Sequence, residues 1–463
     1  MTLVQRVEGS GADGTTHAPN LPRGPGGGED RSPPPPAGRP AGKYSGRHGH
    51  TPARHPTPAA VPGPWRRAAE ATGLLRGGVP APTVFETVTA LAAEHGAVNL
   101  GQGFPDADGP ADLLRLAADA VLAGPNQYAP GGGDAALRRA VVEHRRAHWG
   151  VTEDPDAELL VTAGVTEAIA ATVLALVGPG DEVVTVEPFY DSHAATVALA
   201  GARHVTVPVE PPAFLPDPAR IAAALTVRTR LLILNTPHNP TGAVYPRALL
   251  EEIVRLCRER GVLILSDEVY EHLVFEGEHV SLRSIPGARE IALTASGAGK
   301  AFAVTGWKVG WLAGPAELVA AVRAVKQYLT FSTGPAYQAA MAAYLPRGEA
   351  HLVGQRERYR ATRDTLVAGL RAVGLEPVVP DAGYFVVVDL APWGVTDASA
   401  AVRDWVREAG VAGIPVSALC RPTDDPADAH LASWLRLAFC KSEDVVAEGM
   451  RRLAEAAPRL RRG

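Results

Sequence analysis

The stretch that decides the fold is RLLILNTPHNPTGAVYPRALLEEIVRLCRERGVLILSDEVY, residues 230–270. It begins with an apolar run (230–235), passes through a proline-rich turn and a helical pattern (246–261), and ends with a second apolar run (262–266). Continuous apolar runs indicate strands that are buried on both faces, and a helix between two such strands is typical of a parallel pair. The stretch therefore predicts a mostly parallel sheet that is covered by helices.

The same alternation continues on both sides of this stretch. The C-terminal third differs, because a long helical pattern (351–374), a strand (384–390) and a closing helix (442–457) suggest a smaller α+β unit. The predicted fold class is α/β, with a large domain of mostly parallel sheet between helices and a smaller α+β domain. Further strands are expected at 158–164, 182–186, 204–209 and 290–296, and a helix at 165–177.

These changes of pattern divide the chain into four predicted segments. Residues 1–78 contain GPGGGED, SPPPPAGRP and GRHGH with almost no apolar periodicity, so we expect a disordered tail. Its histidines His48, His50 and His55 have no neighbours that would fix a coordination geometry, so no metal site is predicted. We expect 79–125 to complete the small domain, 126–335 to form the large domain and 336–463 to form the small C-terminal domain.

Composition limits the classes of function. The 463 residues carry 45 Lys and Arg against 50 Asp and Glu, which argues against a nucleic-acid partner. No run of 18 apolar residues and no signal-peptide pattern occurs, so no membrane association is predicted. The three cysteines are far apart, which favours a reduced, cytoplasmic protein over a disulfide framework or a zinc site.

Polar residues follow the predicted strands at the edge where parallel sheets bind ligands. Asn239 lies between two prolines, Asp267 and Tyr270 follow the run 262–266, and Gly164 opens a helix. A buried carboxylate such as Asp267 requires a cation, and none is close in sequence. Each residue also has an ordinary interpretation, because asparagines occur in turns and most helix starts bind nothing.

The segment TASGAGKAFAVTGWK, residues 294–308, contains two lysines among small residues. Small residues allow a ligand to approach the backbone closely, and a desolvated amine becomes a nucleophile toward carbonyl groups. Lys300 is therefore a candidate covalent catalyst.

Taken together, these pieces resemble the fold-type-I, pyridoxal-phosphate-dependent aminotransferases of class I/II. The resemblance covers about four-fifths of the chain, from Val84 to Leu453, and the motifs occur in the family's order. They are NLGQGFPD (99–106), NQYAPGGG (126–133), VTAGVTEAI (161–169), EPFYDS (187–192), NTPHNPTG (235–242), SDEVY (266–270), SGAGKAFAVTGWKVGW (296–311), IPVSALC (414–420) and RLAFCKSED (436–444).

The resemblance implies three catalytic residues. Lys300 matches the lysine that binds pyridoxal 5′-phosphate covalently and later carries the substrate's α-proton. Asp267 matches the carboxylate paired with the pyridinium nitrogen, which would supply the cation that its burial requires. Tyr270 and Asn239 match the pair that hydrogen-bonds the cofactor's phenolic oxygen, and Tyr190 matches the aromatic residue stacked on its ring.

The resemblance also implies a phosphate site. Gly164, Val165 and Thr166 match the helix start that receives the phosphate, and Lys308 matches a cation that neutralises it. Tyr128 matches a tyrosine that reaches the phosphate from the neighbouring subunit, so a homodimer is implied.

The expected substrate residues are Gly103, Asn239 and Arg436. Arg436 matches the arginine that binds the substrate α-carboxylate, a role suited to a bidentate, permanently charged group.

Two positions depart from the family. A hydroxyl residue is common three positions before the lysine, where this chain has Gly297. Either Ser296 binds the phosphate from a shifted backbone, or one contact is lost. Cys420 replaces a residue that is often aromatic, so it either enlarges the pocket or is a small core residue.

The implied function is transfer of an amino group between an L-amino acid and a 2-oxo acid. The motifs are most similar to the kynurenine/glutamine/methionine branch and to actinobacterial N-succinyldiaminopimelate aminotransferases. Cysteine-conjugate β-elimination with the same cofactor remains an alternative. A transcription regulator with an aminotransferase-like sensor domain is disfavoured, because residues 1–80 lack the apolar content of a DNA-binding module.

Overall fold

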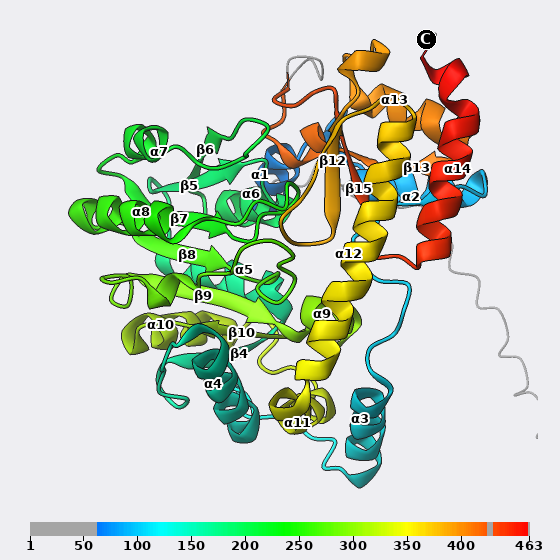
Figure 1. The fold of residues 1–463 in the computed structure, drawn as a ribbon. Coiled ribbons are helices and arrows are strands. Elements are labelled where there is room, and N and C mark those ends of the chain that lie inside the picture. Colours follow the sequence, from blue (N-terminus) through cyan, green and yellow to red (C-terminus); the bar gives the residue numbers. More distant parts are fainter. Residues whose placement is uncertain (1–62, 424–428, 462–463) are drawn as a thin grey trace, which may run out of the picture. The chain divides into compact units, whose positions relative to one another are not determined.

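A seven-stranded sheet lies at the centre of the computed structural model, which describes residues 63–423 and 429–461 (Figure 1). In the described sheet only β10 runs antiparallel to its neighbours β4 and β9, while the other neighbouring pairs are parallel. The prediction of a mostly parallel sheet is therefore confirmed. In spatial order the strands are β4 (Leu159–Ala163), β10 (Val309–Ala313), β9 (Ala292–Gly297), β8 (Leu263–Asp267), β7 (Thr229–Asn235), β5 (Glu182–Glu187) and β6 (Arg203–Pro208).

Both faces of this sheet are covered by apolar clusters. Successive side chains of a strand point to opposite faces, so alternate residues enter different clusters. In β7, Leu231 and Ile233 pack in one apolar cluster with Ile169 of α5, whereas Leu232 packs in another cluster with Ile253 of α8. Each fully buried side chain of this kind contributes about 1.5–3 kcal/mol. The helices of this part are α3 (Ala111–Ala123), α4 (Ala135–Trp149), α5 (Gly164–Leu176), α6 (Asp191–Leu199), α7 (Pro218–Ala224), α8 (Arg247–Arg260), α9 (Ala298–Ala301), α10 (Ala316–Lys326) and α11 (Pro335–Tyr344).

A smaller antiparallel sheet forms the second part, in the order β11-β12-β15-β14. The N-terminal segment joins it, because Val88 and Leu100 are buried in the same cluster as Leu453. The described residues fall within one compact unit, so the domain boundaries stay a prediction. The elements are β11 (Pro377–Val378), β12 (Phe385–Asp389), β14 (Ile414–Pro415), β15 (Trp434–Ala438), the parallel pair β3 (Val98–Asn99) and β13 (Val411–Ala412), and the helices α2 (Val84–Glu94), α12 (Glu349–Ala372), α13 (Ala398–Asp404) and α14 (Glu443–Leu460).

The segment just before α2 is more ordered than the sequence predicts. Helix α1 (Pro64–Ala71) packs against α6, and β1 (Leu75–Arg76) pairs with β2 (Val79–Pro80). The expectation of disorder as far as residue 78 is therefore wrong for residues 63–78, where α1 buries Ala69. Residues 1–62, including His48, His50 and His55, lie outside the described part of the chain.

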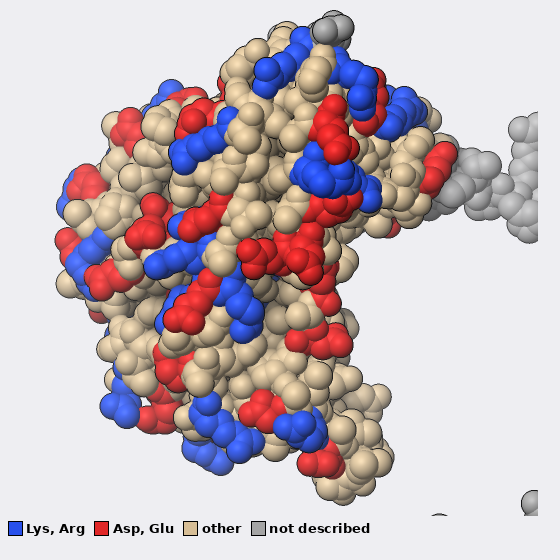
Figure 2. Space-filling model, turned by 45° about the vertical axis from the view of Figure 1, so that its right-hand side comes forward, with Lys and Arg blue, Asp and Glu red and all other residues tan. Residues whose placement is uncertain are grey.

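Charged side chains of both signs are mixed on the surface of the molecule. On the face shown in Figure 2, basic and acidic side chains are interspersed rather than gathered by sign. Exposed ion pairs occur within helices, such as Arg451 with Glu448, and such pairs contribute little stability. Among the described residues, no helix is both long and apolar enough to cross a membrane.

Candidate active site

A cavity of about 370 Å³ lies between the two sheets, at the ends of β7 and β8 and the start of α5. This volume falls within the usual range for small-molecule sites. Parallel strands and helix N-termini meet at this edge, which explains why the site forms here. The cavity brings together Gly103, Gly164, Val165, Thr166, Tyr190, Asn239, Asp267, Tyr270, Lys300, Lys308 and Arg436, whereas Ser296 and Tyr128 do not line it.

Lys300 lies in the short helix α9 that directly follows β9. Its Nζ donates a hydrogen bond of 3.2 Å to the carbonyl oxygen of Gly103 and lies 5.3 Å from the ring centroid of Tyr384. Burial lowers the pKa of Lys300 to about 8, and the positive charge of Arg436 acts in the same direction. The amine is therefore closer to its neutral, nucleophilic form than an exposed lysine would be.

Asp267 ends β8 and is buried. Burial raises the pKa of its carboxyl to about 7, although the backbone N–H of Val269 donates to it at 3.1 Å. Within the described residues Asp267 takes part in no ion pair, so its charge has no direct partner in the protein. A cation in the cavity would relieve this cost, which fits a protonated ring nitrogen.

Arg436, in β15, is buried and stacks 3.9 Å from the ring centroid of Phe385. It donates to the side-chain oxygen of Asn239 at 3.2 Å and to the carbonyl of Gly101 at 3.0 Å. Its Nε is buried with no hydrogen-bond partner among the described residues, and burial lowers the pKa of Arg436 to about 10. A guanidinium with an unused buried N–H suits a carboxylate ligand.

The opposite end of the cavity has the features of an anion site. Gly164 begins α5 with φ +77°, and a Cβ there would lie 3.2 Å from the Nζ of Lys308, so this cation lies beside the helix start. Tyr190 lines the cavity, shares a hydrogen bond with Thr166, and has its pKa raised by burial. Free backbone N–H groups with an adjacent ammonium suit a phosphate group.

Ser296 lies outside the cavity. Its hydroxyl donates at 2.5 Å to the carboxylate of Glu271, and the side chain is buried. The cavity wall is formed instead by Gly297, where a Cβ would lie 2.7 Å from the carbonyl oxygen of Val309. The expectation that Ser296 supplies the missing hydroxyl is therefore not supported, because β9 directs it to the opposite face.

Tyr128 is 85% exposed and packs edge-on against Phe331, with 5.5 Å between ring centroids. It does not reach this chain's own cavity. Its proposed role therefore depends on a second subunit.

Three residues near Lys300 were missing from the predicted site. Tyr384 donates its hydroxyl to the carbonyl of Gly103 at 2.5 Å. Asn235 donates to the backbone oxygen of Asp267 at 3.0 Å, and Gln355 of α12 donates to the carbonyl of Lys300 at 3.0 Å. Only the placement of Asn235 at a strand end could have been noticed in the sequence. Cys420 does not line the cavity, which agrees with the core interpretation.

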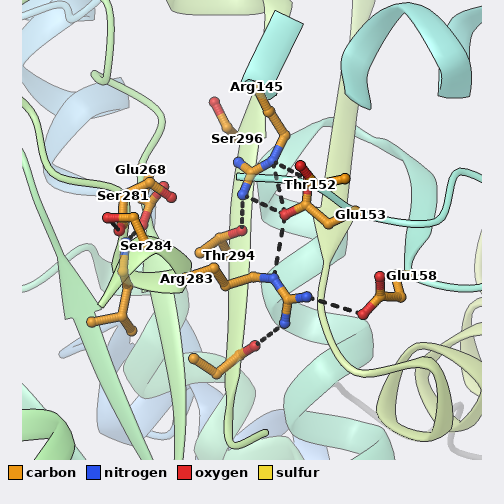
Figure 3. A network of polar contacts seen from close by, with 12 residues as sticks. Arg145, Thr152, Glu153, Glu158, Glu268, Ser281, Arg283, Ser284, Thr294 and Ser296 are labelled. Atoms are coloured by element: carbon orange, nitrogen blue, oxygen red, sulfur yellow. Dashed lines mark hydrogen bonds and ion pairs between the residues drawn. The ribbon is translucent and has the colours of Figure 1, made fainter. Parts of the chain in front are cut away.

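A buried network of ion pairs supports β9 behind the site (Figure 3). Arg145 of α4 pairs with Glu153 at 3.0 Å and donates to Thr294 of β9 at 2.9 Å. Arg283 contacts the same Glu153 at 3.3 Å and Glu158 at 3.2 Å. Because these groups lie among one another and not in the cavity, their role is to fix the strand that leads to Lys300.

The comparisons with known proteins agree with this geometry. The family description "Aminotransferase class I and II" matches residues 96–453, so the chain belongs to the class I and II aminotransferases. It is 47% identical to a probable N-succinyldiaminopimelate aminotransferase of Mycobacterium tuberculosis, over 82% of this chain and 97% of that protein. It is 40% identical to the methionine aminotransferase of Escherichia coli, over 81% of this chain and 95% of that protein.

Solved structures show the same fold. The N-succinyldiaminopimelate aminotransferase of Mycobacterium tuberculosis superimposes with a TM-score of 0.78 at 46% identity, covering 81% of this chain and 97% of that one. The Escherichia coli methionine aminotransferase superimposes with a TM-score of 0.77 at 39% identity, covering the same shares. The fold-type-I prediction and the transaminase prediction are confirmed.

Proposed function

We propose that this aminotransferase uses pyridoxal 5′-phosphate and takes N-succinyldiaminopimelate as its amino donor. The observation that carries the cofactor assignment is that Lys300, Asp267 and Arg436 reach one cavity from separate elements. Burial shifts the pKa of each group in the direction that favours its uncharged form. Three charged groups that line one cavity and form no ion pair among the described residues suit a ligand that is cationic at its ring nitrogen and anionic at its phosphate and at the substrate carboxylate.

The side chains divide the work by position. Asp267 would hold the ring nitrogen, Asn239 and Tyr270 the phenolic oxygen, and Tyr190 the ring face. The start of α5 and Lys308 would hold the phosphate. When bound, pyridoxal phosphate withdraws the electrons that are left when the substrate's α-proton departs.

Lys300 and Arg436 act on the substrate. Arg436 would bind the α-carboxylate through its two N–H edges and so orient the α-carbon. The Nζ of Lys300, whose pKa is about 8, would accept the proton from the substrate's α-carbon and deliver it to C4′ of the cofactor, with the Gly103 carbonyl as its hydrogen-bond acceptor. Two such half-reactions transfer an amino group from one amino acid to a second 2-oxo acid.

The choice of donor is supported by the 47% identity to the Mycobacterium tuberculosis protein, which extends over almost all of that protein. A panel of donors with 2-oxoglutarate as acceptor tests it. N-succinyldiaminopimelate, or its 2-oxo form with glutamate in the reverse direction, should give the highest kcat/KM. A higher value with methionine, kynurenine or glutamine would overturn this choice of donor.

Transamination of methionine or kynurenine is the second candidate, and the apolar part of the cavity lining favours it. Phe85, Phe104 and Leu419 line the cavity, and the cations of the described lining are Lys300, Lys308 and Arg436. If Lys308 binds the phosphate, Arg436 binds the α-carboxylate and Lys300 moves the proton, the distal carboxylates of N-succinyldiaminopimelate must meet a cation from outside this lining. An apolar side chain needs none.

β-Elimination on cysteine conjugates begins with the same proton abstraction, so product analysis separates it from transamination. Incubation with a cysteine conjugate and no 2-oxo acid should release no pyruvate or ammonia. Release of both products would show that elimination is the main reaction.

We also propose a homodimer in the cytosol. Tyr128 is 85% and Tyr328 87% exposed, which leaves aromatic surface uncovered in a single subunit. Cys257, Cys420 and Cys440 are all free and buried, as suits a reducing compartment.

A further inference from the structure

The 100–106 loop crosses the end of strand β15 and lies against it at several points. The backbone N–H of Ala438 donates to the carbonyl of Leu100 at 2.6 Å, and Arg436 donates to the carbonyl of Gly101 at 3.0 Å. Three residues beyond β15, the buried side chain of Lys441 reaches the other end of the loop.

Lys441 makes three contacts with that end. Its Nζ donates at 2.8 Å to the carbonyl of Phe104, pairs at 2.8 Å with the carboxylate of Asp106, and lies 4.6 Å from the ring centroid of Phe104. The backbone N–H of Ser442 also approaches Asp106, at 3.4 Å. One ammonium group therefore holds a backbone carbonyl, a carboxylate and an aromatic ring of the same short loop.

The loop carries atoms of the active site between these two attachments. The carbonyl of Gly103 accepts hydrogen bonds from Lys300 and Tyr384, and Phe104, which is 48% exposed, lines the cavity. The fit is close, because a Cβ on Gly103 would lie 2.6 Å from the ring of Phe385. A small shift of the loop would therefore move the acceptor of Lys300 and the wall beside the substrate together.

We propose that Lys441 is a positioning residue for the amino-transfer reaction: by holding Phe104 and Asp106 it fixes the Gly103 carbonyl at the amine of Lys300 and the Phe104 ring at the substrate. This proposal rests on the proposed function. Lys441 does not line the cavity, so it acts through the loop and touches neither substrate nor cofactor.

If Lys441 served only the stability of the fold, its loss would mainly lower the free energy of unfolding. The carboxylate partner Asp106 keeps 39% of its side chain exposed, and a partly exposed ion pair contributes little to global stability. The contacts to the Phe104 carbonyl and ring act locally, on a segment that ends in the active site. Loss of Lys441 should therefore change the site far more than the free energy of unfolding.

The test compares Lys441→Met and Lys441→Arg in the holoenzyme. Lys441→Met should raise KM for the amino donor about 10-fold with a smaller fall in kcat, because misplacement of a positioning group reduces productive binding. Amide hydrogen exchange of a peptide spanning the 100–106 loop should accelerate. The pH midpoint of the bound cofactor's visible absorption should rise, because water would enter the cavity and the positive charge of Lys441 would be absent. Lys441→Arg should restore all three.

Arg371→Met is the matched control, because it removes one partner of an exposed ion pair with Glu376 at 2.6 Å, outside the cavity lining. It should leave all three readouts unchanged. Unchanged loop exchange and pH midpoint in Lys441→Met would overturn the proposal, as would a loss confined to thermal stability. Hydrogen exchange requires no substrate, so it decides on Lys441 even if the wild type transaminates none of the donors and the proposed function fails.

Discussion

At the residue scale, the site contains charges that the protein alone does not neutralise. Burial raises the pKa of Asp267 to about 7 and lowers that of Lys300 to about 8, so each group moves toward its neutral form in the cofactor-free chain. Such opposed shifts of an acid and a base in one cavity are characteristic of catalytic sites.

Lys300→Ala should abolish transamination and the visible absorption band of the bound cofactor, since both depend on the same amine. Absorption spectra and a coupled assay of 2-oxo acid formation measure the two effects. Far-ultraviolet circular dichroism should match the wild type, because removal of a buried amine leaves no charge unpaired. A variant that kept both the band and the activity would disprove the role of Lys300.

Arg436→Ala should raise KM for amino donors about 100-fold, with kcat less affected, because loss of one partner of a buried charged pair costs about 2–5 kcal/mol. The charge itself is buried beside Phe385, so substitution also removes a stacking contact. Steady-state kinetics with two amino donors that differ in their side chains separate the loss of carboxylate binding from the loss of the stacking contact. An unchanged KM for both would show that another group binds the α-carboxylate.

Asp267 should make the cofactor-free protein less stable as pH rises from about 4 to 7. The folded-state pKa of about 7 lies above the ordinary value of a carboxyl group, so the native state binds more protons than the unfolded state in this range. Ionisation then costs at most about 4 kcal/mol. Urea unfolding of wild type and Asp267→Asn across this range should show a difference that grows with pH; parallel curves would contradict the assigned shift.

At the element scale, the site depends on three glycines where β9, β10 and α5 meet. A Cβ on Gly310 would lie 2.6 Å from the backbone carbon of Gly164, and one on Gly297 would lie 2.7 Å from the carbonyl of Val309. The strands therefore approach the start of α5 more closely than other residues permit. The sequence showed these glycines but not their purpose, because β10 was not among the predicted strands, and its neighbour β4 is distant in the chain.

Gly310→Ala should displace the start of α5, lower stability by about 1–3 kcal/mol and weaken binding of pyridoxal phosphate. Urea unfolding and fluorescence titration with the cofactor measure the two effects. Gly306→Ala is the matched control in the same region, because a Cβ there would meet nothing within 4 Å. Equal behaviour of the two variants would show that the contact with Gly164 does not hold the phosphate site in place.

At the scale of the whole molecule, one subunit does not contain every expected cofactor contact. The cavity is formed between the two sheets of one chain. Tyr128 of the same chain does not line this cavity but lies exposed to solvent beside Phe331. Tyr128 and Tyr328 are both largely exposed, and exposed aromatic surface is a feature of interaction sites. The assembly therefore completes the phosphate site if Tyr128 enters the cavity of a partner.

Tyr128→Phe should weaken pyridoxal phosphate binding roughly 10-fold, because a hydrogen bond to a charged group contributes about 1.5–3 kcal/mol. Sedimentation velocity should show a dimer for both wild type and variant, since the aromatic ring is retained. A monomeric wild type that binds the cofactor with full affinity would remove any role for Tyr128 across an interface.

By itself the sequence determined the parallel sheet and the positions of its main strands and helices, and it predicted a site with Lys300, Asp267, Asn239 and Arg436, which line one cavity. These follow from local apolar patterns and from short motifs at strand ends. Tertiary structure alone decided which face Ser296 takes, where β10 lies, and that Lys441 contacts a loop 337 residues away. The physical reason is that these features depend on close packing between segments far apart in the chain, which no local pattern records.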